Sequence, residues 1–170
     1  MKKVFFLAAL LVCSIAAQAQ RFALVDMEYI LKQIPAYEQA NQQMESLSKQ
    51  WQSEVEAKAQ EAKTMYDEHQ KNASNLSATQ KTAQENAIIA KEKEAADLRK
   101  KYFGPEGEGM KKRQELITPI QDAIYNAIKD IATQKNYDAV IDRASAQSMI
   151  FASPRIDISN EVLAKLGYSN

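Results

Sequence analysis

The chain has 170 residues, with 22 basic and 22 acidic side chains and no formal net charge at neutral pH. This length is that of one domain, and the charge balance argues against the strongly basic surface on which nucleic-acid binding depends. One cysteine and one histidine cannot form a Cys/His zinc cluster. We therefore expect no nucleic-acid partner, no metal and no cofactor.

The first 19 residues have the three parts of a bacterial secretory signal peptide. Lys2 and Lys3 form the positive start, residues 4–16 are apolar, and Ala17-Gln18-Ala19 matches the small-residue cleavage pattern. We predict export to the periplasm with cleavage after Ala19. The apolar run is too short to span a membrane, and no later segment is long enough, so we expect no transmembrane segment.

Cys13 could instead be the site of a lipid anchor. A small residue should precede a lipidated cysteine, and Val12 is not small, so the cleavable signal is favoured. Cleavage removes the only cysteine together with two lysines, which leaves 20 basic against 22 acidic residues. The mature chain then contains no disulfide.

The mature chain begins with a short apolar run, residues 21–25, which predicts a buried strand. Asp26 is a helix N-cap residue type and predicts a short helix over residues 27–33 that Pro35 ends.

The stretch from Ala36 to Phe103 contains no glycine and no proline, and its few large apolar residues predict long, mostly solvated helices. An apolar seam recurs at spacings of three and four, as in a coiled coil, and then weakens; it consists of Tyr37, Ala40, Met44, Leu47, Trp51 and Val55, followed by Lys58, Ala62, Met65 and His69. Asn and Ser cluster at residues 72–77, and Ser77 with Gln80 has capping-box spacing. We predict a helical-hairpin arm, residues 37–109, with its tip near 72–77.

Three of the four glycines follow Phe103 and should end the returning helix. The next helix has a richer apolar face that predicts a packed core; this face consists of Met110, Ile117, Ile120, Ile124, Ile128 and Ile131. Pro119 lies within it and should kink or restart the helix.

The last part of the chain predicts two strands, residues 137–142 and 148–151, and an extended piece at 155–158. Ser159 should cap a final helix over residues 160–166, with Gly167 at its end. Strands this short leave open edges, so we predict that residues 20–36 and 110–170 form a body completed by self-association. Its candidate core is Phe22, Leu24, Ile117, Ile124, Ile128, Ile131, Val140, Ile141, Met149 and Phe151.

No residue pattern favours catalysis. His69, the only histidine, lies near the arm tip, and Asp138 and Asp142 are more simply a solvated strand face than a carboxylate pair. No glycine-rich phosphate loop is present, so ATP-driven action is not supported. The candidate functional residues are the bulky apolar groups of the arm, which either pack its two helices together or contact non-native chains; they are Met44, Leu47, Trp51, Val55, Met65, Tyr66, Leu76, Ile88 and Ile89.

The motifs, taken in order, resemble the Skp/OmpH family of periplasmic chaperones over residues 21–168. They are FALVDMEYIL, the arm, YFGPEG, ITPIQDAIYNAIKDIA, NYDAVID and IDISNEVLAKL. The resemblance implies a homotrimer whose fold is α+β but mostly α, with a long helical-hairpin (coiled-coil) arm on a small body of strands and helices. It also implies an ATP-independent holdase for unfolded outer-membrane β-barrel proteins.

One departure from the family concerns charge. Familiar members have basic arms, whereas this arm has 10 basic and 11 acidic residues between Ala36 and Phe103, which argues against lipopolysaccharide binding. Two other classes of protein are considered: a structural coiled-coil spacer of the bacterial envelope, which should have a stronger seam, and a small envelope enzyme, for which no nucleophile or metal set is evident.

Overall fold

The computed structural model describes residues 20–146 and 148–168, and the predicted signal peptide lies outside them. The chain forms two compact units, one running from Pro35 to Asp122 and the other containing the segments before and after it. Their boundary falls inside a helix, beyond residue 109, where we predicted the arm to end. The extent of the arm in the assembled protein stays a prediction.

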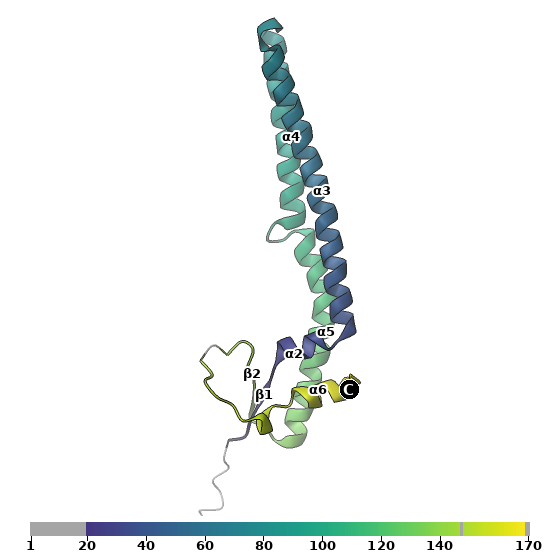
Figure 1. Cartoon of the computed structure of the whole chain (residues 1–170), viewed down its shortest axis with the longest axis vertical. Coiled ribbons are helices and arrows are strands. Elements are labelled where there is room, and N and C mark those ends of the chain that lie inside the picture. The colour runs from purple at the N-terminus through teal and green to yellow at the C-terminus, as the bar shows by residue number, and fades with distance from the viewer. Residues whose placement is uncertain (1–19, 147, 169–170) are drawn as a thin grey trace, which may run out of the picture. The chain divides into compact units, whose positions relative to one another are not determined.

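Two long helices pack side by side as a hairpin in the first unit (Figure 1). Helix α3 (Pro35–Asn72) leads to a 3-10 turn, η2 (Ala73–Asn75), and α4 (Ala78–Phe103) returns. The predicted capping box is confirmed, because Ser77 Oγ accepts from the backbone N–H of Gln80 at 3.3 Å and Gln80 Oε1 accepts from that of Ser77 at 2.9 Å. The hairpin is therefore defined at its turn by local side-chain chemistry.

The glycines after α4 end that helix, as predicted. A Cβ atom on Gly104 would lie 2.4 Å from the carbonyl oxygen of Lys100, so only glycine fits this close approach. Helix α5 (Glu108–Lys135) follows, and Pro119 lies inside it without interrupting it. The expectation that Pro119 restarts the helix is therefore wrong: proline removes one backbone N–H, and the neighbouring turns keep their hydrogen bonds.

The second unit contains a parallel pair of strands. Strand β1 (Phe22–Val25) pairs along its whole length with β2 (Ala139–Asp142). The other edge of β1 is covered by the chain near the C-terminus, where Leu24 forms a bridge with Asp157 and accepts a hydrogen bond from the N–H of Ile158 at 2.9 Å. The bridge at Asp157 thus extends the two-stranded sheet at the free edge of β1.

Helices cover this sheet and form its core. Helix α2 (Met27–Lys32) begins at Asp26, whose carboxylate accepts from the N–H of Tyr29 at 2.8 Å, which confirms the predicted cap. Helix α6 (Ser159–Lys165) lies against α2. The buried apolar side chains of the unit come from β1, α2, α5, α6 and the residues just outside α2 and α6, and they are Ala23, Leu24, Val25, Ile30, Ile34, Ile124, Ala127, Ile131, Ile158, Val162 and Leu163.

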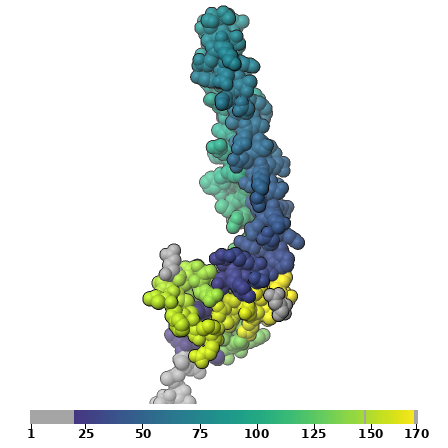
Figure 2. All heavy atoms as spheres, in the orientation of Figure 1, coloured from purple at the N-terminus to yellow at the C-terminus, as the bar shows by residue number. Residues whose placement is uncertain are grey.

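The structure differs from two predictions for the C-terminal segment. Residues 148–151 form no strand: Ile150 is fully exposed and Phe151 is 83% exposed, because no neighbouring strand pairs with this segment in the described chain. The predicted extended piece at 155–158 is confirmed only in part: its first two residues belong to a 3-10 turn, η3 (Pro154–Ile156), started by proline and capped by Ser153, whereas Asp157 is extended and forms the bridge with Leu24. Figure 2 shows the segment between β2 and α6 on the surface of its unit.

The start of α6 also differs from the prediction. Its N-cap residue is Ile158, and Ser159 is the first helical residue. The hydroxyl oxygen of Ser159 instead accepts from the backbone N–H of Asp26 at 2.8 Å, so a tertiary contact replaces the local cap. At the other end of the helix, Gly167 has a φ of +86°, the left-handed conformation predicted for a glycine stop.

Candidate functional site

The hairpin is held together by a thin apolar seam that ends in an aromatic cluster. Trp51, Val55 and Tyr102 are buried together, with Leu47 and Leu98 packed against them. Farther toward the turn the buried seam positions are two alanines, Ala62 and Ala95, and a single larger residue, Ile88. The seam therefore has its largest contacts at the end away from η2, which we call the base, and its smallest toward the turn, which we call the tip.

A hydrogen bond closes the aromatic cluster. The hydroxyl of Tyr102 donates to Glu54 Oε2 at 2.6 Å. This bond, with a second one from Gln50, holds the pKa of the Glu54 carboxyl below its usual value, and the Glu54 acceptor in turn raises the pKa of the Tyr102 hydroxyl. The pair joins α3 to the last turn of α4, so its role is to hold the two helices together.

One flank of the hairpin carries two adjacent shallow hollows, which we call the groove. The hollow nearer the base has a volume of about 250 Å³ and is lined by Gln52, Val55, Glu56, Arg99 and Phe103. The next has a volume of about 390 Å³ and is lined by Ala59, Ala62, Lys63, Tyr66, Glu92 and Ala95. Their α3 members recur at spacings of three and four residues, so both hollows lie on one face.

Large apolar side chains border this groove in exposed positions. Phe103 is 46% exposed at the base and Tyr66 is 49% exposed toward the tip, while Ile89, one turn from Glu92 on α4, is 61% exposed. Exposed groups of this size beside shallow hollows offer adaptable apolar contact without an enclosed pocket. The groove suits an extended or irregular partner better than a small molecule.

On the opposite flank of the hairpin, charged side chains form ion pairs that bridge the two helices. Lys58 pairs with Glu61 at 3.1 Å, Lys91 reaches Glu61 at 3.5 Å across the two helices, and Lys91 also pairs with Glu94 at 2.9 Å. The same network lowers the pKa of Glu61, mainly through its hydrogen bond with Lys58. The two flanks thus differ, one being apolar and open and the other polar and bridged.

The predicted arm residues separate into two groups. Trp51, Val55 and Ile88 are buried in the seam, and Met44, Leu47, Met65 and Leu76 are half-buried. Tyr66 is exposed at the groove, and Ile89 is exposed one helical turn from the groove residue Glu92. Phe103 was missed as a functional candidate, although an aromatic residue directly before a glycine turn was a usable signal.

The predicted body residues show a similar division. Leu24, Ile117, Ile124 and Ile131 are buried, and Ile128, Val140 and Met149 are half-buried. Phe22, Ile141 and Phe151 are exposed in the single chain. Whether these residues form the core of a trimer stays a prediction.

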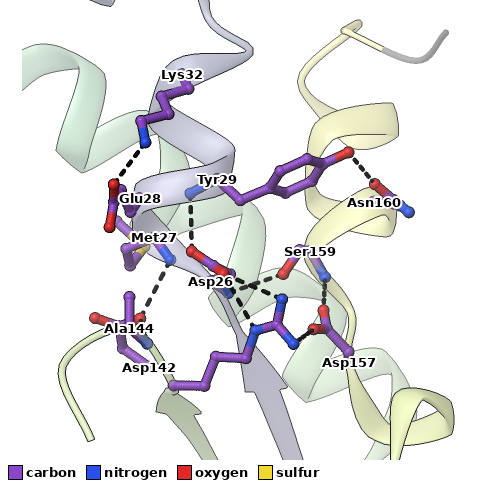
Figure 3. Close-up of polar contacts among 11 residues, drawn as sticks. Asp26, Met27, Glu28, Tyr29, Lys32, Asp142, Ala144, Asp157, Ser159 and Asn160 are labelled. Atoms are coloured by element: carbon purple, nitrogen blue, oxygen red, sulfur yellow. Dashed lines mark hydrogen bonds and ion pairs between the residues drawn. The ribbon is translucent and has the colours of Figure 1, made fainter.

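A polar network in the second unit was not predicted. Arg143 Nη2 lies 3.1 Å from Asp26 Oδ2, and its Nη1 lies 3.3 Å from Asp157 Oδ2. Tyr29 Oη donates to Asn160 Oδ1 at 2.9 Å at the edge of the same network (Figure 3). Arg143, Asp157, Tyr29 and Asn160 line a cavity of about 330 Å³. The bonds of the network join the ends of β1 and β2 to the start of α6.

Asp138, just before β2, and Asp142, its last residue, have structural partners. Asp138 Oδ2 accepts from the backbone N–H of Arg21 at 2.7 Å, and Asp142 Oδ1 accepts from that of Ala144 at 3.0 Å. Within residues 20–146 and 148–168, no group of three or more His, Cys, Asp or Glu side chains could hold a metal ion. In the same ranges, no helix has the length and apolar character needed to cross a membrane.

Comparison with known proteins covers nearly the whole described chain. Residues 21–166 match the family model described as outer membrane protein (OmpH-like). The chain is 29% identical over 158 residues to Chaperone protein Skp of Yersinia enterocolitica, covering 92% of each chain, and 30% identical over 127 residues to that of Photorhabdus luminescens, covering 75% of each. An OmpH-like crystal structure from Caulobacter crescentus shares the fold, with a TM-score of 0.67 at 11% identity over 89% of this chain and 86% of that one.

Proposed function

Because the chain belongs to the OmpH-like family, we propose that it is an ATP-independent periplasmic holdase that binds unfolded outer-membrane β-barrel proteins and prevents their aggregation. The observation that carries this proposal is the groove, an open flank with exposed Phe103, Tyr66 and Ile89 and no enclosed pocket. The relatives named Chaperone protein Skp support the same activity.

Holding would rest on many weak apolar contacts. Each exposed side chain of the groove contributes in proportion to the apolar area that a client covers, at about 25 cal/mol per Å². The shallow hollows fit side chains of varied shape, so binding would depend little on client sequence. Weak contacts repeated on several linked arms gain from high effective concentration, which permits retention without a deep site.

The arms would be linked by trimerisation through the second unit. This part of the proposal is supported by apolar groups that stay exposed in the single chain, Ile150, Phe151 and Ile141. An exposed apolar loop beside an open strand edge is a common basis for association between copies. In a trimer these groups would be covered by neighbouring chains, and three hairpins would extend from one body.

The decisive experiment measures suppression of aggregation. An unfolded outer-membrane barrel is diluted from denaturant into the protein without ATP, and light scattering follows aggregation at low and high salt. Apolar capture should persist at high salt, because salt screens charge attraction and not apolar contact. A correctly assembled trimer that gives no suppression would refute the holdase, and suppression lost at moderate salt would refute the apolar mechanism.

Variants then test whether the groove is the binding surface. Changing Tyr66 and Ile89 together to Ser removes exposed apolar area with little effect on the seam, and should weaken holding. Tyr125→Ser is the matched control, since Tyr125 is 64% exposed on α5 in the other unit. Equal holding by the groove variant and the control would show that clients bind elsewhere.

A further inference from the structure

The groove carries four exposed charged side chains in a regular order. From base to tip, α3 contributes Glu56 and then Lys63, while α4 contributes Arg99 and then Glu92. The sign therefore alternates along each helix, and it is opposite on the two helices at each level. This order is independent of the apolar groups on which the proposed client binding rests.

These charges have no ion-pair partners of their own. Over the described ranges, no ion pair involves Glu56, Lys63, Glu92 or Arg99, and Glu56 only accepts a hydrogen bond from Gln52 at 3.0 Å. The bridged flank of the same hairpin uses its charges fully, in the network around Glu61. The groove charges are therefore available to a partner with the complementary order.

A second copy of the groove has that complementary order. If two grooves face each other with their bases together, Glu56 lies opposite the partner's Arg99, and Lys63 opposite the partner's Glu92. If they face each other base to tip, Glu56 lies opposite the partner's Lys63, and Arg99 opposite the partner's Glu92. Both twofold arrangements place only opposite charges together, which is the self-complementarity required of an isologous contact.

The centre of the groove permits close approach. Its floor consists of small or buried side chains, Val55, Ala62 and Ala95, so a facing helix is not held away by bulk. Phe103 and Tyr66 border the groove toward its two ends, which lie about 21 Å apart at 1.5 Å per residue from Gln52 to Tyr66. Facing grooves would cover these exposed rings and remove them from water.

We propose that the groove of one hairpin binds the groove of a second copy of this chain, with the Glu56/Lys63 and Arg99/Glu92 edges in register, when no other partner occupies it. This contact is separate from the proposed trimer body, and it does not require the holdase proposal. It would protect the exposed apolar side chains of the empty hairpin.

The test uses zero-length coupling of lysine to carboxylate between isotopically distinct chains. Unlabelled and ¹⁵N-labelled chains are unfolded, mixed and refolded together, then coupled, and the linked peptides are read by mass spectrometry. The inference expects peptides of mixed isotope joining Lys63 to Glu92 or to Glu56. Lys58–Glu61 is the internal control, since this pair at 3.1 Å within one chain should give links of a single isotope only.

Charge-swap variants confirm the register. If the bases lie together, the double variant Lys63→Glu with Glu92→Lys should keep the mixed-isotope link between positions 63 and 92. If the grooves run base to tip, the double variant Lys63→Glu with Glu56→Lys should keep the link between positions 63 and 56. Glu56→Lys alone should lower the yield of the mixed-isotope Lys63–Glu92 link about tenfold if bases lie together, because two symmetry-related pairs with Arg99 become repulsive. Glu92→Lys alone should lower the yield of the Lys63–Glu56 link by the same factor if the grooves run base to tip, for the same reason. Single-isotope links only at position 63 of the wild type, or a mixed-isotope yield that both single variants leave unchanged, would overturn the inference.

Discussion

The rings of Trp51 and Tyr102 stack with their centroids 5.1 Å apart and their planes 9° apart. Phe103 meets Trp51 edge-on, with centroids 6.3 Å apart. Because Tyr102 lies in the last turn of α4, this stack joins α3 to the point where the chain leaves the hairpin. It is the aromatic contact of a seam that otherwise consists of aliphatic side chains and alanines.

Trp51→Ala should destabilise the hairpin by about 3 kcal/mol, through lost burial and the cavity left beside Tyr102. Helix unfolding in urea, followed by circular dichroism, measures the change. Tyr125→Ala serves as the control and should change stability by less than about 0.5 kcal/mol, because an exposed side chain makes few contacts. Equal effects of the two substitutions would show that the stack does not hold the helices together.

Tyr102→Phe should make the hairpin less sensitive to acid. The hydroxyl of Tyr102 lowers the pKa of Glu54 in the folded chain, so the bond contributes stability above the ordinary carboxyl pKa of about 4.3 and loses it as the pH falls through the lowered value. Acid titration of the unfolding midpoint measures this difference. The control is Tyr66→Phe, which removes a hydroxyl that accepts from Gln70 on the exposed surface, and it should keep the wild-type acid profile. An unchanged acid profile for Tyr102→Phe would exclude the linkage between Tyr102 and the pKa of Glu54.

Gly104→Ala should cost about 1–3 kcal/mol, since the new methyl group would overlap the carbonyl of Lys100. The cause is space and not conformation, because Gly104 has a φ of −66° that any residue adopts. Thermal unfolding measures the effect, with exposed Pro105→Ala as the control. A stabilised Gly104→Ala protein would mean that the turn relaxes without cost.

Ile124→Asp should unfold the second unit, because Ile124 is fully buried and the new carboxylate would have no partner. The expected loss is on the order of 4 kcal/mol or more, against about 1 kcal/mol for the control Ile124→Val. Light scattering on both variants and the wild type reports the oligomer together with the unfolding. A wild type that is a compact monomer would contradict the trimer proposal, and an Asp variant of unchanged stability would contradict the packing.

Local chemistry was readable in the sequence. Asp26, the Ser77–Gln80 box and Gly167 each act on backbone groups within a few residues, so their residue types alone predicted where helices begin and end. The absence of glycine and proline between Ala36 and Phe103 likewise predicted the long helices of the hairpin, and the ordered motifs predicted the family.

Only the tertiary structure decided which surfaces and partners these elements use. Residues 148–151 have the composition of a strand, but a strand exists only where another strand accepts its hydrogen bonds, and no such neighbour is present in the described chain. Serine is likewise a common N-cap residue, yet the hydroxyl of Ser159 accepts from the backbone N–H of Asp26, far away in the sequence. The seam spacing predicted which residues face the other helix. It did not predict that one flank would be bridged through Glu61 and the other open as the groove, because this depends on which side chains of α3 and α4 lie at the same level.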